Sequence, residues 1–192
     1  MPPALHSREE VVDRLMLVLR RQGYARASLS ELSKATGLGK SSLYHHFPDG
    51  KDDMTRAVLD RLAGQLRVAL FDPLRVAGDP KRRISTMVAT LGAFYHGGRE
   101  ACLLGGLVVG ETRERFHQQL AAIFEEWIEA IAKALRDAGV SRGLARVRAE
   151  DAVIRIQGAL TLVGALDERA VFMRTLRQLP GDLLAPVQAR RS

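Results

Sequence analysis

Apolar residues recur at helical spacing along almost the whole chain, and almost no segment alternates between apolar and polar positions as a strand does. The clearest pattern predicts one long helix from about residue 51 into the seventies. Its apolar stripe repeats at intervals of four: Met54, Val58, Leu62, Leu66 and Leu70. The hydrophobic pattern therefore predicts an all-α protein.

Helix start and stop signals divide the rest of the chain. A first helix is predicted over residues 7–22, ended by Gly23. Asp79 is a typical N-cap and Pro80 suits the first helical position, so a helix begins there and ends before Gly97. Further helices are predicted over residues 101–109, 112–138, 147–166 and 168–178, and the segment 140–145 is predicted to be a flexible loop.

Residues 28–51, SLSELSKATGLGKSSLYHHFPDGK, predict two short helices joined by a tight turn. Ser28 and Glu31 have the spacing of a capping box, which begins the first helix. Gly37 allows the positive φ that a tight turn between steeply angled helices needs. Leu43 anchors the second helix on the rest of the domain. This pattern is typical of a helix-turn-helix.

The other face of that second helix carries hydrogen-bond donors and small side chains, which suit phosphates and base edges in the major groove of double-stranded DNA. These residues are Lys40, Ser41, Ser42, Tyr44 and His45. In a symmetric dimer, two such helices would meet the half-sites of a palindromic operator about 34 Å apart.

Residues 35–47, ATGLGKSSLYHHF, followed by Lys51, resemble the DNA-binding signature of TetR-type transcriptional repressors. The glycine, the Leu-Tyr pair and the Phe-x-x-x-Lys spacing occur together. The resemblance implies an N-terminal three-helix helix-turn-helix domain, residues 1–50, and a larger C-terminal helical domain for effector binding and dimerisation, residues 51–192. It also implies that Ser28 and Lys51 hold phosphates while Lys40, Ser41, Ser42, Tyr44 and His45 face the groove or its walls.

The segment 147–166 predicts a dimer interface, because its apolar residues surround too much of one helix to be covered by a single neighbour. They are Val153, Ile154, Ile156, Leu160, Leu162, Val163 and Leu166. Gly158, Ala159 and Gly164 would permit close approach of another helix, and Phe172 and Leu176 would extend the interface. The alternative is that these residues complete the core of a monomer.

The resemblance implies a pocket for a small, largely apolar effector in the C-terminal domain. Its candidate lining is Met87, Phe94, Tyr95, Cys102, Leu103, Phe116, Phe124, Trp127 and Gln157. Aromatic and methionine side chains at helical spacing also form ordinary packed cores, so that alternative stays open for each of them.

Cys102 begins a Cys-Leu-Leu-Gly segment that resembles one found in a TetR subgroup including electrophile-responsive repressors. A position near a helix start, with Arg99 nearby, would lower the thiol pKa and favour reactivity. One alternative function is therefore a thiol-sensing repressor. The other interpretation is a small hydrophobic residue packed in the core.

Composition adds less than the motif. The formal net charge is +7, yet residues 1–60 hold nine Lys and Arg against eight Asp and Glu, so the surplus lies downstream. One cysteine excludes an internal disulfide framework, and no signal peptide or membrane-length apolar run is present. We expect a cytoplasmic protein that does not enter the membrane.

No catalytic motif stands out. Gly39-Lys40-Ser41 resembles the end of a P-loop, but the earlier glycine would fall at Lys34. The adjacent His45 and His46 lack zinc-protease spacing, and His96, Glu100, Cys102 and His117 are too scattered to indicate a metal site. We expect no enzyme activity, cofactor or metal. A helical enzyme or small-molecule-binding protein without a role on DNA is the remaining alternative.

Overall fold

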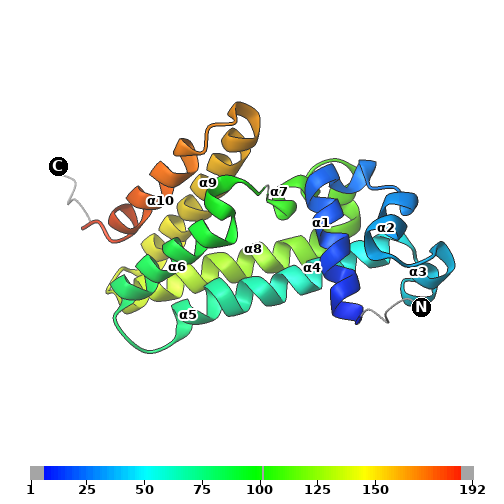
Figure 1. The fold of residues 1–192 in the computed structure, drawn as a ribbon. Coiled ribbons are helices and arrows are strands. Elements are labelled where there is room, and N and C mark those ends of the chain that lie inside the picture. The colour runs from blue at the N-terminus through cyan, green and yellow to red at the C-terminus, as the bar shows by residue number, and fades with distance from the viewer. Residues whose placement is uncertain (1–6, 101, 187–192) are drawn as a thin grey trace. The chain divides into compact units, whose positions relative to one another are not determined.

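The computed structural model describes residues 7–100 and 102–186, and over these residues the chain is helical with no strand (Figure 1). This confirms the predicted all-α class, with an N-terminal helix-turn-helix followed by a larger helical region. Helix α1 spans Arg8–Arg26, α2 spans Leu29–Thr36 and α3 spans Lys40–His46. Gly23 interrupts the helical backbone of α1 with φ 73° and ψ 165°, at the position predicted as its end.

The long helix predicted from residue 51 is present as three consecutive helical segments. They are α4 (Lys51–Leu66), a π-helical turn η1 (Arg67–Phe71) and α5 (Asp72–Arg75). All five apolar residues spaced by four, from Met54 to Leu70, are buried. The amide of Asp72 donates to the carbonyl of Arg67, five residues back, which accommodates one extra residue in the turn.

The middle of the chain holds α6 (Pro80–Phe94), a 3₁₀ turn η2 (His96–Gly98), α7 (Leu103–Leu107) and α8 (Glu111–Asp137). The Asp79 carboxylate accepts from the Lys81 amide at 3.1 Å and caps α6 as predicted. The prediction of a short helix from residue 101 begins at Ala101, which lies outside the described residues.

The last two helices are longer than predicted: α9 spans Arg142–Leu166 and α10 spans Ala170–Leu183. The predicted loop at residues 140–145 is wrong, because Ser141 occupies the N-cap position and Ala145 is already buried in the first turns of α9. Helix α10 continues through Pro180. Arg148 of α9 donates to the carbonyl oxygens of Leu183 and Ala185 at 2.9 and 2.7 Å and so stabilises that helix end.

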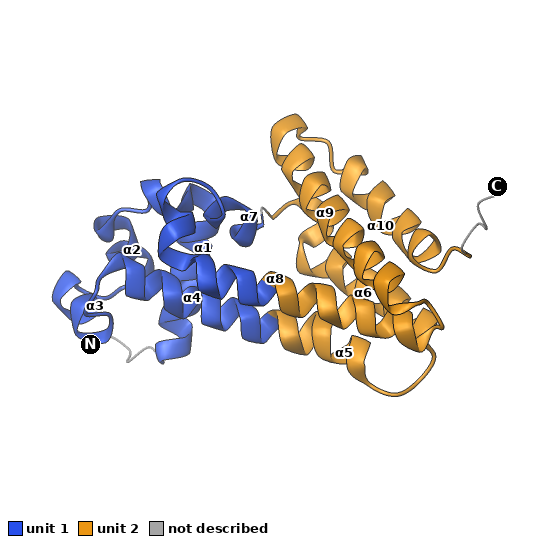
Figure 2. Cartoon of the chain, turned by 180° about the vertical axis from the view of Figure 1, so that it is seen from behind, with its two compact units in different colours: residues 1–65, 101–123 blue, residues 66–100, 124–192 orange. Residues whose placement is uncertain are grey.

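The chain forms two compact units, and each draws on separate stretches of sequence (Figure 2). Unit 1 contains residues 1–65 and 101–123, and unit 2 contains residues 66–100 and 124–192. The first half of α8 therefore packs with the helix-turn-helix, together with α7. The predicted functional division into residues 1–50 and 51–192 stays a prediction.

Each unit has its own core. In unit 1, Leu15 and Leu19 of α1 are buried with Leu32 of α2, Leu43 of α3 and Val58 of α4. In unit 2, the Trp127 ring stacks near Phe71 with centroids 6.3 Å apart, and Phe172 meets Tyr95 edge to face at 6.0 Å. Phe172 and Leu176 are buried within the chain, so the structure assigns these two residues to its own core.

Candidate nucleic-acid interface

A complete capping box begins α2. The Glu31 amide donates to Ser28 Oγ at 3.3 Å, and the Ser28 amide donates to Glu31 Oε2 at 2.9 Å. These bonds from Ser28 lower the pKa of Glu31 and keep the carboxylate charged. The capping-box prediction is confirmed, and the Ser28 amide is already used inside the chain.

The turn between α2 and α3 is fixed by local bonds. Gly37 has φ 74° and ψ 5°, the left-handed conformation predicted for it. Ser33 Oγ donates to the Leu38 carbonyl at 2.6 Å across the turn. Arg14 Nη1 of α1 donates to the Thr36 carbonyl at 3.1 Å, so the end of α2 is also held by the first helix.

Helix α3 has one buried face and one exposed face. Leu43 is fully buried, and so is Phe47 directly after the helix. The side chains predicted to meet DNA are all exposed: Lys40, Ser41, Ser42, Tyr44 and His45. The structure thus brings these five residues together on one short helix, with their polar groups open to a partner.

The Tyr44 ring lies against Gly50, which the sequence pattern did not single out. A Cβ at Gly50 would lie 3.3 Å from the Tyr44 ring, and Gly50 also has φ 64°. Two reasons therefore require glycine here: the left-handed backbone and the close approach of the tyrosine ring. The Gly50 amide closes the turn by donating to the Phe47 carbonyl at 2.9 Å.

Lys51, predicted to hold a phosphate, is half-buried against the end of α1. Its Nζ donates to the Tyr24 carbonyl at 2.9 Å and lies 4.1 Å from the centroid of the Tyr24 ring. Lys51 therefore differs from the exposed residues of α3, because its ammonium already has partners within the chain.

The ion pairs of unit 1 show which of its cations stay available to an anionic partner. Many of its carboxylates are engaged internally: Asp13 with Arg61, Asp52 with Arg115, and Asp53 with Arg56. Arg26, Lys34 and Lys40 are exposed and make no ion pair with any described residue. The sequence pattern did not single out Arg26 and Lys34, because a list of charges does not show which cations are already paired.

The predicted effector residues fall into both units. Cys102, Leu103 and Phe116 belong to unit 1, where the Phe116 ring contacts Tyr24 with centroids 5.7 Å apart. The remaining candidates belong to unit 2: Met87, Phe94, Tyr95, Phe124, Trp127 and Gln157. Among them Met87, Tyr95 and Trp127 are buried, and Phe94, Phe124 and Gln157 are half-buried.

Two of these unit 2 residues carry buried polar atoms that lack a partner. Trp127 Nε1 and Gln157 Nε2 make no hydrogen bond with any described residue. An unpaired buried donor costs about 1–3 kcal/mol, so a molecule with an acceptor could recover that free energy at either position.

The candidate metal ligands do not form a cluster within the described residues. Nowhere in residues 7–100 and 102–186 do three or more His, Cys, Asp or Glu side chains gather as metal ligands would. Of the scattered candidates, His96 lies near Glu100, with Nε2 3.5 Å from Oε1. Over the same residues, the search for a helix of sufficient length and hydrophobicity to span a membrane found none.

Two family models match separate parts of the chain. Residues 12–58 match the model of bacterial regulatory proteins of the TetR family. Residues 82–178, half of the chain, match that of the LmrA/YxaF-like transcriptional regulator C-terminal domain.

Individual relatives agree with these matches. The HTH-type transcriptional regulator LmrA of Bacillus subtilis is 25% identical over 160 residues, which cover 81% of this chain and 85% of LmrA. A TetR transcriptional regulator from Legionella pneumophila has the same fold, with a TM-score of 0.80 at 17% identity over 92% of this chain and 97% of that one.

A second similar structure was solved on DNA. It is a cysteine mutant of the TetR family regulator CifR with 26-base-pair double-strand operator DNA, with a TM-score of 0.75 at 22% identity over 95% of this chain and 98% of that one. The predicted resemblance is confirmed, and the family consists of transcription regulators rather than enzymes. The chain belongs to the TetR family of bacterial transcriptional regulators, with a C-terminal domain of the LmrA/YxaF type.

Proposed function

We propose that this regulator is a homodimeric repressor that acts in the cytoplasm, binds a palindromic operator through α3 and is released by a small, largely apolar effector. The two-faced α3 supports DNA binding most directly. Its buried Leu43 fixes the helix on unit 1, while the exposed Lys40, Tyr44 and His45 are free to meet DNA. Such a helix fits the major groove. Lys40 and Lys51 would add phosphate contacts whose contribution to affinity depends on salt.

The direct test is selection of DNA from a random-sequence pool by the purified full-length protein at physiological salt. We expect a palindromic sequence with two half-sites, and we expect that sequence upstream of genes under the regulator's control. A pool that stays random after several rounds, with binding lost equally to any competitor DNA, would overturn the proposal.

Tyr44→Ala tests the contribution of α3 to that binding. We expect operator affinity to fall about 5- to 150-fold, because a lost base or groove contact costs about 1–3 kcal/mol. Gln118→Ala is the control, since it truncates another exposed side chain of unit 1. Unfolding measurements check that both variants are folded, and unchanged affinity of Tyr44→Ala would remove Tyr44 from the interface.

The proposed dimer interface is the outer face of α9 and α10. Of the apolar residues predicted there, Val153, Ile156, Leu160 and Val163 are buried within the chain. The exposed large apolar side chains of these helices are Val147, Ile154, Leu162, Leu166 and Met173, with exposed fractions of 52, 66, 47, 60 and 38%. A Cβ at Gly158 or Gly164 would meet nothing within 4 Å, so a second copy of the helix pair has room to approach.

We propose Trp127 and Gln157 of unit 2 as candidate effector contacts, because the buried donor of each lacks an acceptor among the described residues. A largely apolar molecule that carries a carbonyl or similar oxygen would satisfy them. Trp127 is the only tryptophan of the chain, so its fluorescence reports on this site alone. Compounds should be screened by that fluorescence and then tested for release of the selected operator.

Thiol sensing through Cys102 is a second candidate, based on its half-exposed position before α7. Cys102→Ser separates the two mechanisms. If the variant still releases the operator with effector but no longer with an electrophile such as N-ethylmaleimide, the thiol is an additional input. If the electrophile acts equally on both proteins, Cys102 is not the sensor.

A further inference from the structure

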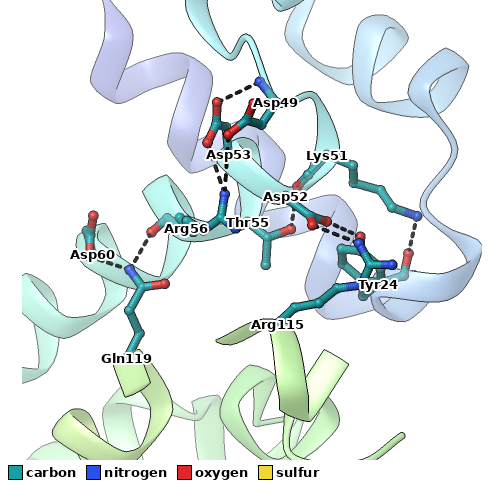
Figure 3. A network of polar contacts seen from close by, with 10 residues as sticks. All are labelled: Tyr24, Asp49, Lys51, Asp52, Asp53, Thr55, Arg56, Asp60, Arg115 and Gln119. Carbon is teal, nitrogen blue, oxygen red and sulfur yellow. Dashed lines mark hydrogen bonds and ion pairs between the residues drawn. The ribbon is translucent and has the colours of Figure 1, made fainter. Parts of the chain in front are cut away.

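Tyr24, Asp52 and Arg115 form a chain of polar contacts that ends at Lys51 (Figure 3). Arg115 Nη1 of α8 donates to Asp52 Oδ2 of α4 at 2.8 Å. The other oxygen of Asp52 accepts from the Tyr24 hydroxyl at the end of α1. Lys51 then donates to the Tyr24 carbonyl and lies over the Tyr24 ring. We call Tyr24, Asp52 and Arg115 the Lys51 support; all three belong to unit 1.

The support fixes the surface against which Lys51 lies. The Tyr24 ring is held at its hydroxyl by Asp52 and at its edge by Phe116, with ring centroids 5.7 Å apart. Burial, followed by the hydrogen bond to Asp52, raises the pKa of Tyr24 to about 12, so the phenol stays a donor at neutral pH. Partial burial alone would raise the pKa of Asp52, but the Tyr24 and Arg115 bonds outweigh it and lower that pKa. The carboxylate is therefore charged and occupied on both oxygens.

The contacts of Lys51 leave it able to bind a phosphate. A lysine ammonium has three donors, and the Tyr24 carbonyl accepts one of them. Lysine is among the side chains that lose the most rotamer freedom when they are fixed. A lysine already ordered by its carbonyl and ring contacts loses less when a phosphate binds.

We propose that Tyr24, Asp52 and Arg115 are positioning residues for DNA binding, which hold Lys51 at the start of α4 in the orientation that meets a backbone phosphate. The inference rests on the proposed DNA-binding function. It gives Arg115 a role in operator affinity although α8 carries none of the residues predicted to touch DNA. Arg115 lies 63 residues from Asp52 in the sequence.

The test compares Arg115→Met with Arg113→Met. Both variants remove one positive charge from α8, but the Arg113 side chain is exposed and makes no hydrogen bond or ion pair with any described residue. Using the operator duplex obtained by selection, we expect Arg115→Met to weaken binding about 3- to 10-fold more than Arg113→Met. We also expect the slope of log affinity against log salt to shrink by about 0.9, the loss of one phosphate contact, as in Lys51→Met.

The same pair of replacements in the Lys51→Met background isolates the positioning role. If Arg115 acts through Lys51, Arg115→Met then costs no more than Arg113→Met; an equal penalty in both backgrounds would overturn the inference. Tyr24→Phe keeps the ring and carbonyl while freeing Asp52, so it should show a smaller loss that also disappears without Lys51. This second variant keeps the test decisive if Arg115→Met unfolds.

Two further outcomes separate the failure of this inference from the failure of the proposed function. Unchanged affinity and salt slope in Lys51→Met would overturn the inference and leave operator binding by α3 intact. A selection that yields no preferred DNA sequence would overturn both.

Discussion

Gly50 shows how one residue position can control a proposed contact with DNA. It has φ 64°, and the Tyr44 ring occupies the space that a side chain would need. We predict that Gly50→Ala lowers the free energy of unfolding by about 1–2 kcal/mol, the cost of a left-handed conformation in a residue with a Cβ. It should also weaken operator binding, because Tyr44 must shift.

Gly64→Ala is the matched control for this prediction, measured by urea unfolding of both variants. Gly64 lies inside α4 with helical backbone, and a Cβ there would meet nothing within 4 Å. We expect that variant to gain about 0.5–1 kcal/mol, since alanine is favoured over glycine in a helix. A Gly50→Ala protein as stable as the wild type would mean that the turn relaxes without strain.

Residues whose roles depend on near neighbours were predictable from sequence. Ser28 with Glu31 and the turn at Gly37 follow from chemistry within a few positions, and the structure confirms both. Arg115 was not predictable in this way, because its partner Asp52 is 63 positions distant and nothing in the α8 pattern distinguishes it from Arg113. Long-range contacts of this kind need the folded chain.

At the scale of elements, α1 and α2 both begin with a capping box. Ser7 and Glu10 form a capping box on α1, as Ser28 and Glu31 do on α2. We predict that Ser7→Ala and Ser28→Ala each lower the free energy of unfolding by about 1 kcal/mol, the usual loss for such a cap. If Ser28 also holds a phosphate, only Ser28→Ala should reduce operator affinity beyond the effect of lost stability.

Chemical denaturation and operator titration of the two serine variants provide that comparison. Equal losses of affinity in Ser7→Ala and Ser28→Ala would show that Ser28 acts only as a helix cap. The pair is informative because the two capping boxes have the same local geometry, but only Ser28 lies directly at the start of α2.

Helix positions followed from periodicity, but several helix ends did not. The buried residues at intervals of four in α4 and the cap of α6 match the predictions. Gly143 and Pro180 are both disfavoured inside helices, so the local sequence does not indicate that α9 begins at Arg142 or that α10 continues to Leu183. Arg148 stabilises the last carbonyls of α10 from another helix, a contact that no local pattern contains.

At the scale of the whole molecule, the sequence predicted the fold class and the family but not the composition of the two units. Residues 101–123 pack with the first 65 residues because α7 and the start of α8 return to the N-terminal helices. A division of the sequence at one point cannot predict a unit that is built from two separate stretches of the chain. The predicted effector residues are consequently divided between the two units.

The exposed apolar side chains of α9 and α10 give the last prediction, which concerns the assembly. We expect the wild-type protein to have about twice the 21.1 kDa mass of one chain in solution. Leu162→Glu should shift it to a monomer, because desolvating an unpaired carboxylate at the interface costs several kcal/mol, about 100-fold or more in the dimerisation constant. Light scattering after size-exclusion chromatography measures both masses.

Val68→Glu provides the control, since Val68 is 75% exposed on η1 and belongs to no part of the proposed interface. It should stay dimeric. The monomeric Leu162→Glu protein should also lose most of its affinity for the palindromic operator while retaining weak binding to a single half-site, because each α3 then binds alone. A monomeric wild-type protein would contradict the proposed dimer and its binding to two half-sites. A Leu162→Glu protein that remains a dimer would show that the exposed apolar face of α9 and α10 is not the dimer interface.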